Sequence, residues 1–417
     1  MKKMIISLLF CMIAAHVYAF NCVVDGICYD TNSEKSTATV LGYDQSETAN
    51  AEIVRIPGHI MHKGIRYKVS MISNRAFYGV GWLAEVTIEN GVDSIGSEAF
   101  ADCAHLEKIT MPKSTKNIGR CCFSGCTRLS TVILPSNIDE LSDFCFEACT
   151  SLVSIKIPSG LRKIGKHCFL GCRSLSEINI PKSVKYIGEG CFMNCRSLPH
   201  DNGIMYAGTC AVGVADKSRH KYEMRKNTRF IGSYCFATCK ELLTIDIPKN
   251  VIHVGTAAFK NCTSLEEISL PCSITSIEPL TFAGCESLKS NVIPKCVSVI
   301  GEYAYAGCRR LSCVTLPRNI ASIQDRVFAE CMNIRDIFCQ SDIPPVLGVN
   351  TFDSSIYQAC TLHVRKKDME CKVKPMENIP NRAYVNYFTV SHRPTPYCTD
   401  SENIVLILDR VRGCHVS

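Results

Sequence analysis

Aromatic residues recur every 23 residues along most of this 417-residue chain, and this spacing constrains the fold more than any other feature. The unit is clear from Ile164 to Pro181, IGKHCFLGCRSLSEINIP, in which Phe169 is the aromatic anchor. A fixed period of a few tens of residues, in units too small to bury a core alone, is typical of a stacked solenoid. The anchors are Phe77, Phe100, Phe123, Phe146, Phe169 and Phe192, then Phe236, Phe259, Phe282, Tyr305 and Phe328, with Phe352 one residue late.

Each unit contains an apolar alternation that ends at a proline, as from Leu175 to Pro181. Ile178 and Ile180 with Asn179 between them predict a short, half-buried strand, and stacking such strands predicts a parallel sheet that the chain leaves at the proline. The segment from Cys168 to Leu175 spaces its apolar residues by three, which predicts one or two tight helical turns opposite the sheet.

An Ile-Gly dipeptide follows the proline in many units, as at Ile164-Gly165. Glycine is often required where φ is positive. Ser142, Glu278 and Gln324 occupy the same position in other units, however, so the sequence predicts no compulsory positive φ there.

Cysteine is unusually abundant, with 28 residues, and most of them follow the repeat. Five units have a Cys-x-x-x-Cys spacing around the anchor, which could place two metal ligands on one helical turn. Ala, Thr and Val replace the first cysteine in other units, so that position needs a small side chain, and cross-links between adjacent coils would brace only short loops. The sequence therefore predicts buried free thiols and no metal site. The cysteines one residue before an anchor are Cys122, Cys145, Cys168, Cys191 and Cys235. The cysteines three residues after an anchor are Cys103, Cys126, Cys149, Cys172, Cys195, Cys239, Cys262, Cys285, Cys308 and Cys331.

The array is interrupted once, between Phe192 and Phe236, by an insertion at residues 200–221. Its first part, Gly203 to Val214, predicts a β-hairpin. The basic residues Lys217, Arg219 and Lys221 follow. Insertions in repeat proteins commonly project from one face and carry specificity, although a solvated basic loop is the simpler interpretation.

The two ends of the chain differ from the array. Residues 1–19 have the basic start, apolar run and small-residue cleavage site of a signal peptide, and the run is shorter than the roughly 18 residues that span a membrane. Residues 20–56 predict β-hairpins that cap the solenoid of residues 57–364. Residues 365–417 predict a closing cap followed by an irregular tail.

Charge and hydropathy narrow the class of protein. The formal net charge is +7 and falls to +5 without Lys2 and Lys3, which is too weak to indicate nucleic-acid binding. No segment after the signal peptide reaches membrane-spanning length. We therefore expect an exported protein at the cell surface or outside the cell, with the periplasm as an alternative.

The repeat resembles the BspA-like leucine-rich repeats of bacterial surface proteins, most clearly from Leu242 through Ile245, Pro248, Val254 and Phe259 to Cys262. The opening Val23 to Tyr29 also looks like the start of such exported proteins from Bacteroides-type bacteria. This resemblance implies an α/β repeat fold, a curved right-handed leucine-rich repeat solenoid with one parallel sheet face. It also implies an adhesin or surface antigen with no enzyme activity.

The outward positions of the predicted sheet vary while the inward ones repeat, so a binding surface is the best-supported kind of site. A mixture of acidic, hydroxyl and occasional apolar groups on a broad, shallow area suits a protein or glycan on host or bacterial surfaces better than a small molecule. A glycan-binding component of an uptake system is the alternative function. We expect no catalytic residue and no cofactor. The candidate surface residues are Glu85, Lys108, Thr110, Glu177, Asn179, Thr244, Asp246 and Glu267, with Lys217, Arg219 and Lys221 of the insertion.

Overall fold

The structure is a computed structural model that describes residues 20–44, 52–352, 360–365 and 403–407. The predicted signal peptide and most of the predicted tail lie outside the described residues. The chain divides into two compact units, which are described separately. The first is Met1–Val184 with Met193–Ser197, and the second is Lys185–Phe192 with Leu198–Ser417.

The first unit begins with antiparallel strands and continues as parallel coils. β1 pairs with β2 and β2 with β3 in antiparallel fashion, β5 and β6 form a second hairpin, and β3 lies parallel to β6. The sheet continues through β8 to β10. Its strands are β1 (Cys22–Val24), β2 (Ile27–Asn32), β3 (Thr37–Tyr43), β5 (His59–His62), β6 (Ile65–Ile72), β8 (Ser94–Ile95) and β10 (Asn117–Ile118). That these hairpins cap the array stays a prediction.

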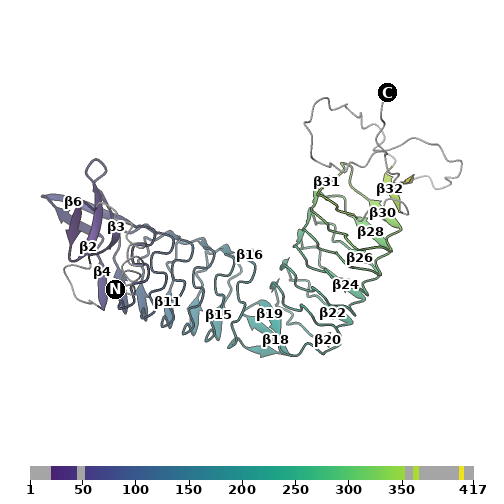
Figure 1. The fold of residues 1–417 in the computed structure, drawn as a ribbon, viewed down its shortest axis with the longest axis horizontal. Helices are drawn as coiled ribbons and strands as arrows, with labels where there is room; N and C mark the ends of the chain where they lie inside the picture. Colours follow the sequence, from purple (N-terminus) through teal and green to yellow (C-terminus); the bar gives the residue numbers. More distant parts are fainter. Residues whose placement is uncertain (1–19, 45–51, 353–359, 366–402, 408–417) are drawn as a thin grey trace, which may run out of the picture. The chain divides into compact units, whose positions relative to one another are not determined.

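A second sheet of the first unit contains six parallel strands, among them β4, β11 and β15 in Figure 1. Partner residues on neighbouring coils are 23 apart, as in the row Ile109, Val132, Ile155. β12 (Glu140–Leu141) pairs in parallel with β14 (Lys163–Ile164) on another side of the coils. The six strands are β4 (Ile53–Ile56), β7 (Glu85–Ile88), β9 (Lys108–Thr110), β11 (Thr131–Ile133), β13 (Ser154–Lys156) and β15 (Glu177–Asn179). The first unit is thus a parallel β-solenoid.

The second unit has the same plan after an antiparallel start. In one sheet, β17 (His200–Asp201), β18 (Ile204–Ala207) and β19 (Cys210–Val214) are antiparallel neighbours, and β19 lies parallel to β21 (Phe230–Ile231), which pairs with β23 (His253–Val254). The predicted hairpin segment therefore lies at the edge of a coil sheet. A short strand before it is β16 (Tyr186–Ile187).

Three further sheets complete the second unit. One contains β20 (Lys221–Tyr222), β22 (Thr244–Asp246) and β24 (Glu267–Ser269). Another contains β25 (Ser276–Ile277), β27 (Val299–Ile300), β29 (Ser322–Ile323) and β31 (Val346–Leu347). The last contains β26 (Asn291–Val292), β28 (Cys313–Leu316), β30 (Asp336–Cys339), β32 (Thr361–Arg365) and the antiparallel β33 (Asn403–Ile407).

The aromatic anchors form a stack inside each unit. Phe77 and Phe100 have ring centroids 5.2 Å apart and planes 2° apart, and the stack continues to Phe169. In the second unit it runs from Phe236 to Phe352. These anchors are at most 2% exposed. Each such pair adds about 0.5 to 1.5 kcal/mol to the free energy of burying the rings, so the stack holds successive coils together.

The expected short helical turns are not confirmed, because the described residues contain no helix. The residues two before and two after Phe100, Glu98 and Asp102, have φ values of 57° and 58°. The same two positions are left-handed around the other anchors. For Phe352 this holds for Asn350, since residue 354 lies outside the described residues. A left-handed residue interrupts a right-handed helix. The segment instead makes consecutive tight turns, and the Phe100 amide donates to the Cys122 carbonyl oxygen of the next coil at 2.9 Å.

The Ile-Gly glycines are explained by close packing between coils. Gly119 and Gly165 do not have a positive φ, which confirms the sequence prediction. A Cβ at Gly119 would lie 2.4 Å from the Ser97 backbone nitrogen, and one at Gly165 would lie 2.6 Å from the Asp143 nitrogen. At these two positions the preceding coil approaches too closely for a side chain.

Candidate functional surfaces

The outer face of the six-stranded sheet carries five of the predicted surface residues. In β9, Ile109 points inward and is buried, while Lys108 and Thr110 are exposed; in β15, Glu177 and Asn179 are exposed on either side of Ile178. We call this surface, formed by the outward side chains of β4, β7, β9, β11, β13 and β15, the first outer face. Alternate side chains of each strand point to opposite sides of the sheet, which is why every second residue belongs to this face.

Glu85 and Lys108 are brought together on this face. They are register partners on β7 and β9, and the Lys108 Nζ lies 2.7 Å from the Glu85 Oε1. Thr110 lies between Thr87 and Ile133 in the neighbouring row. An exposed ion pair of this kind contributes up to about 1 kcal/mol to stability, so the pair is available to exchange partners with a ligand.

Ile133 is a surface residue that is not among those predicted from the sequence. Its side chain is 80% exposed on the first outer face, between Thr110 and Lys156. The signal was present, because the run Val132, Ile133 and Leu134 replaces the apolar and polar alternation of other coils. The structure thus places an exposed isoleucine between a threonine and a lysine of the neighbouring strands.

Thr244, Asp246 and Glu267 lie on the corresponding sheet of the second unit. Lys221, Thr244 and Glu267 form one row across β20, β22 and β24. The Lys221 Nζ also lies 3.2 Å from the Asp246 Oδ2. Lys221 of the insertion is therefore part of the same surface as the predicted strand residues.

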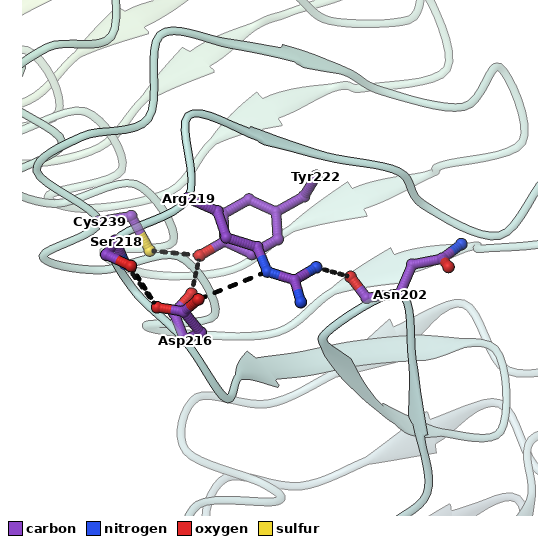
Figure 2. Close-up of polar contacts among 6 residues, drawn as sticks. All are labelled: Asn202, Asp216, Ser218, Arg219, Tyr222 and Cys239. Atoms are coloured by element: carbon purple, nitrogen blue, oxygen red, sulfur yellow. Dashed lines mark hydrogen bonds and ion pairs between the residues drawn. The ribbon is translucent and has the colours of Figure 1, made fainter.

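The other two basic residues of the insertion bind atoms of the protein, and Figure 2 shows the contacts of Arg219. Lys217 donates to the Ala237 carbonyl oxygen at 2.9 Å and to the Thr238 Oγ1 at 2.8 Å. Arg219 donates to the Asn202 carbonyl oxygen at 2.9 Å, and its Nε lies 3.6 Å from Asp216 Oδ2. These side chains hold the insertion against the coils, so the three basic residues do not converge on a common open site.

Tyr222 and Cys239 lie beside this contact; Cys239 was predicted from the sequence as a buried repeat thiol, whereas Tyr222 was not singled out. The Tyr222 hydroxyl donates to the Asp216 carbonyl oxygen and lies 3.8 Å from the Cys239 Sγ, as Figure 2 shows. Burial raises the pKa of both side chains. Two hydrogen bonds from Ser218 lower the pKa of Asp216, its neighbouring Arg219 acting in the same direction. A neutral tyrosine and thiol beside a carboxylate fixed by local hydrogen bonds form a structural network.

A second polar cluster lies near the end of the second unit. The His363 Nε2 lies 2.8 Å from the Asp336 Oδ1, and the His363 ring stacks on Phe338 with centroids 4.2 Å apart. His363 is not among the surface residues predicted from the sequence. It lies outside the 23-residue anchor pattern, two residues into β32.

The repeated cysteines are packing and hydrogen-bonding groups. Cys103 and Cys126 are buried and donate to the carbonyl oxygens of Phe77 and Phe100 at 3.0 and 3.1 Å. Burial raises the pKa of Cys103 to about 12, whereas a nucleophilic or metal-binding cysteine needs a thiolate. Among the residues that the structure describes, no group of three or more His, Cys, Asp and Glu side chains could hold a metal ion.

The part of the chain that the structure describes includes no helix long and apolar enough to cross a membrane.

Stacked 23-residue coils with strands in parallel register define a leucine-rich repeat solenoid. Comparison with known families gives the particular type: the BspA type leucine-rich repeat region matches residues 70–199 and 226–363, with 6 copies. The chain belongs to this family.

Solved structures that match this chain come from several bacteria. A leucine-rich cell surface protein from Faecalibacterium prausnitzii is 26% identical, with 76% of this chain and 94% of that chain covered and a TM-score of 0.42. A leucine-rich repeat protein from Bacteroides ovatus is 25% identical, with coverage of 81% and 93% and a TM-score of 0.35. The pneumococcal vaccine antigen PcpA is 20% identical, with coverage of 76% and 87% and a TM-score of 0.38. No curated protein matched significantly.

Proposed function

We propose that this chain is an exported, non-enzymatic leucine-rich repeat protein that binds macromolecules on host or bacterial surfaces, as an adhesin or surface antigen does. The observation that carries the proposal is the first outer face, where Ile133 is 80% exposed among charged and hydroxyl side chains. The signal-like residues 1–19 support export.

The composition of the first outer face favours a protein partner. An apolar contact at Ile133 would be surrounded by Thr110, Lys108 and Lys156, which supply hydrogen bonds and charge around it. Protein interfaces commonly have this arrangement, with an apolar centre and a polar rim. The surface is built on strands fixed in register, so its side chains need little ordering when a partner binds.

Binding can be measured with the purified mature chain on immobilised extracellular matrix proteins and on epithelial cells. The combined substitution Lys108→Ala, Thr110→Ala and Ile133→Asp should reduce saturable binding at least tenfold without changing the circular dichroism spectrum. The matched control is Glu140→Ala with Lys163→Ala. This pair also joins neighbouring coils, at 3.3 Å, but lies on another sheet, so its loss should leave binding unchanged.

Two results would refute the proposal for this face: no saturable binding to any surface in a broad panel, or equal losses from the outer-face and control substitutions.

Glycan binding in an uptake system is the second candidate, favoured by the row Lys221, Thr244 and Glu267, whose polar groups could hydrogen-bond sugar hydroxyls. Retention of soluble oligosaccharides, lost on Thr244→Ala and Glu267→Ala, would support this alternative.

A further inference from the structure

Cys272 and Cys296 are exposed thiols on neighbouring coils of the second unit. All other cysteines within the described ranges are buried or only partly exposed. Each of the two follows a proline that ends a strand region: Cys272 is the first residue after Pro271, and Cys296 is the second after Pro294. Since coils repeat every 23 residues, Cys296 lies on the next coil, displaced from Cys272 by one residue along the chain.

Side chains at the equivalent position of other coils extend along this diagonal. Asn137 Nδ2 donates to the Lys113 carbonyl oxygen at 2.9 Å, and Asn319 Nδ2 donates to the Lys295 carbonyl oxygen at 3.3 Å. Each asparagine occupies the position of Cys296 in its coil, and each lysine occupies the position of Cys272 in the preceding coil. An asparagine side chain at the Cys296 position therefore extends to the backbone of the residue 24 positions earlier.

The rotamer decides which neighbour is reached. Serine at this position turns the other way, since Ser273 Oγ donates to the Val251 carbonyl oxygen. Cysteine can adopt either staggered rotamer. With about 4.8 Å between coils and about 3.8 Å between consecutive Cα atoms, the diagonal Cα distance is about 6 Å, within the range of roughly 4.4 to 6.8 Å that a disulfide requires.

The same two coils have an interrupted sheet. β24 pairs with β22, and β26 pairs with β28, but the described residues show no ladder between β24 and β26. These coils remain joined through β25 and β27 and by the Lys289 amide, which donates to the Glu266 carbonyl oxygen at 3.2 Å. A covalent bond shortly after β24 and β26 would link the coils on the side where the ladder is missing.

We propose that Cys272 and Cys296 are an oxidative modification site and form a disulfide between coils. The oxidant is a disulfide, such as glutathione disulfide or the active-site disulfide of a thiol oxidoreductase. One thiolate attacks it and releases one reduced thiol, and the second thiolate then resolves the mixed disulfide and releases the other. The two cysteines lose two electrons and two protons, which the oxidant takes up as two thiols.

The test uses the full mature chain, incubated with glutathione disulfide and then alkylated with N-ethylmaleimide during denaturation. Tryptic digestion without reductant should yield residues 261–289 linked to residues 296–309, with tandem mass spectrometry locating the bond at Cys272 and Cys296. The oxidised chain should incorporate two fewer maleimides than the reduced chain. Cys272→Ser and Cys296→Ser should each abolish the cross-linked peptide, whereas Cys121→Ser, at a partly exposed thiol, should retain it.

An engineered pair tests the geometry independently. Lys113→Cys with Asn137→Cys places two thiols at the equivalent positions of the first unit and should form the same type of cross-link under the same conditions. Maleimide on both Cys272 and Cys296 after oxidation, glutathione on both, or a disulfide-linked dimer through them would each overturn the proposal.

Discussion

The thiol of Cys126 donates a hydrogen bond to the backbone carbonyl oxygen of Phe100, with 3.1 Å between Sγ and O. The two residues are 26 apart, so the bond joins neighbouring coils directly beside the aromatic stack. The same relationship joins Cys149 to Phe123 and Cys262 to Phe236, each at 3.1 Å. The repeated cysteine is therefore a small buried group that also satisfies a carbonyl oxygen.

Cys126→Ala should lower the free energy of unfolding by about 1 to 3 kcal/mol, because it leaves the Phe100 carbonyl oxygen without this donor and opens a small cavity. Urea denaturation followed by circular dichroism would measure the change. Cys272→Ser, measured with reductant present, is the control, since that thiol is exposed and should shift the unfolding midpoint little. Equal effects of the two substitutions would show that the intercoil bond does not stabilise the fold.

Gly119 and Gly171 should respond differently to alanine although both belong to the repeat. A Cβ at Gly119 would lie 2.4 Å from the Ser97 nitrogen, a backbone atom that cannot move aside without shifting the coil. At Gly171 the nearest atom is 3.7 Å away, and only the φ of +75° opposes a side chain. Gly171→Ala should therefore cost about 1 kcal/mol, by left-handed strain alone.

For Gly119→Ala we expect a loss of at least about 3 kcal/mol, or no soluble protein, because overpacking here forces a backbone shift. Thermal unfolding of both variants would provide the comparison. If Gly171→Ala proved the more damaging of the two, close coil packing would not be the reason for glycine at the Ile-Gly position.

Ala148→Gly should stabilise the protein by about 0.5 to 1 kcal/mol. Ala148 has φ 56° and lies two residues after the Phe146 anchor, where other coils have Gly125 or Gly171. Glycine removes the strain of the left-handed conformation, and the entropy of the unfolded chain offsets only part of this gain. The control is Ala258→Gly, at a buried alanine without positive φ, which should be destabilising. A fall in the unfolding temperature of Ala148→Gly would contradict the strain argument.

The left-handed positions also mark what the sequence could not predict. Apolar spacing by three from Cys168 to Leu175 fits helical turns and consecutive tight turns equally well, because both bring the side chains at i and i+3 to one side. The distinction depends on two residues per coil, and their identities vary: Glu98, Cys121 and Phe144 all occupy the same left-handed position. Nothing in such side chains indicates a positive φ.

The stacked coils and the buried anchors, by contrast, were predictable because a 23-residue period leaves few ways to bury a phenylalanine in each unit. The candidate surfaces were predictable only as outward positions. Which charges meet depends on the register between coils, as for Glu85 with Lys108, and on the path of the insertion, which pairs Lys217 with backbone oxygen instead of leaving it open. Ile133 shows that an exposed apolar residue within a strand is read most easily as core.

Alkaline pH should destabilise the fold through the buried thiols. Burial raises the pKa of Cys103, Cys195 and Cys285 from the ordinary value of 9.0 to about 12. Between these values the unfolded chain releases the thiol protons while the folded chain keeps them. The folded state then binds more protons, so the free energy of unfolding decreases as pH rises.

The stabilisation is fully present below pH 9 and is lost progressively between about pH 9 and 12, with a slope of about 1.4 kcal/mol per pH unit for each such thiol. Urea unfolding at intervals from pH 8 to 11 would measure the slope. Cys285→Ser keeps a small hydrogen-bonding group but removes one titrating thiol. The variant should therefore release about one proton fewer on unfolding in this pH range, and its slope should be shallower. Cys272→Ser, at an exposed thiol, is the control and is measured with reductant present. Parallel slopes for Cys285→Ser and the unsubstituted chain would mean that this thiol ionises equally in both states, contrary to its burial in the stack.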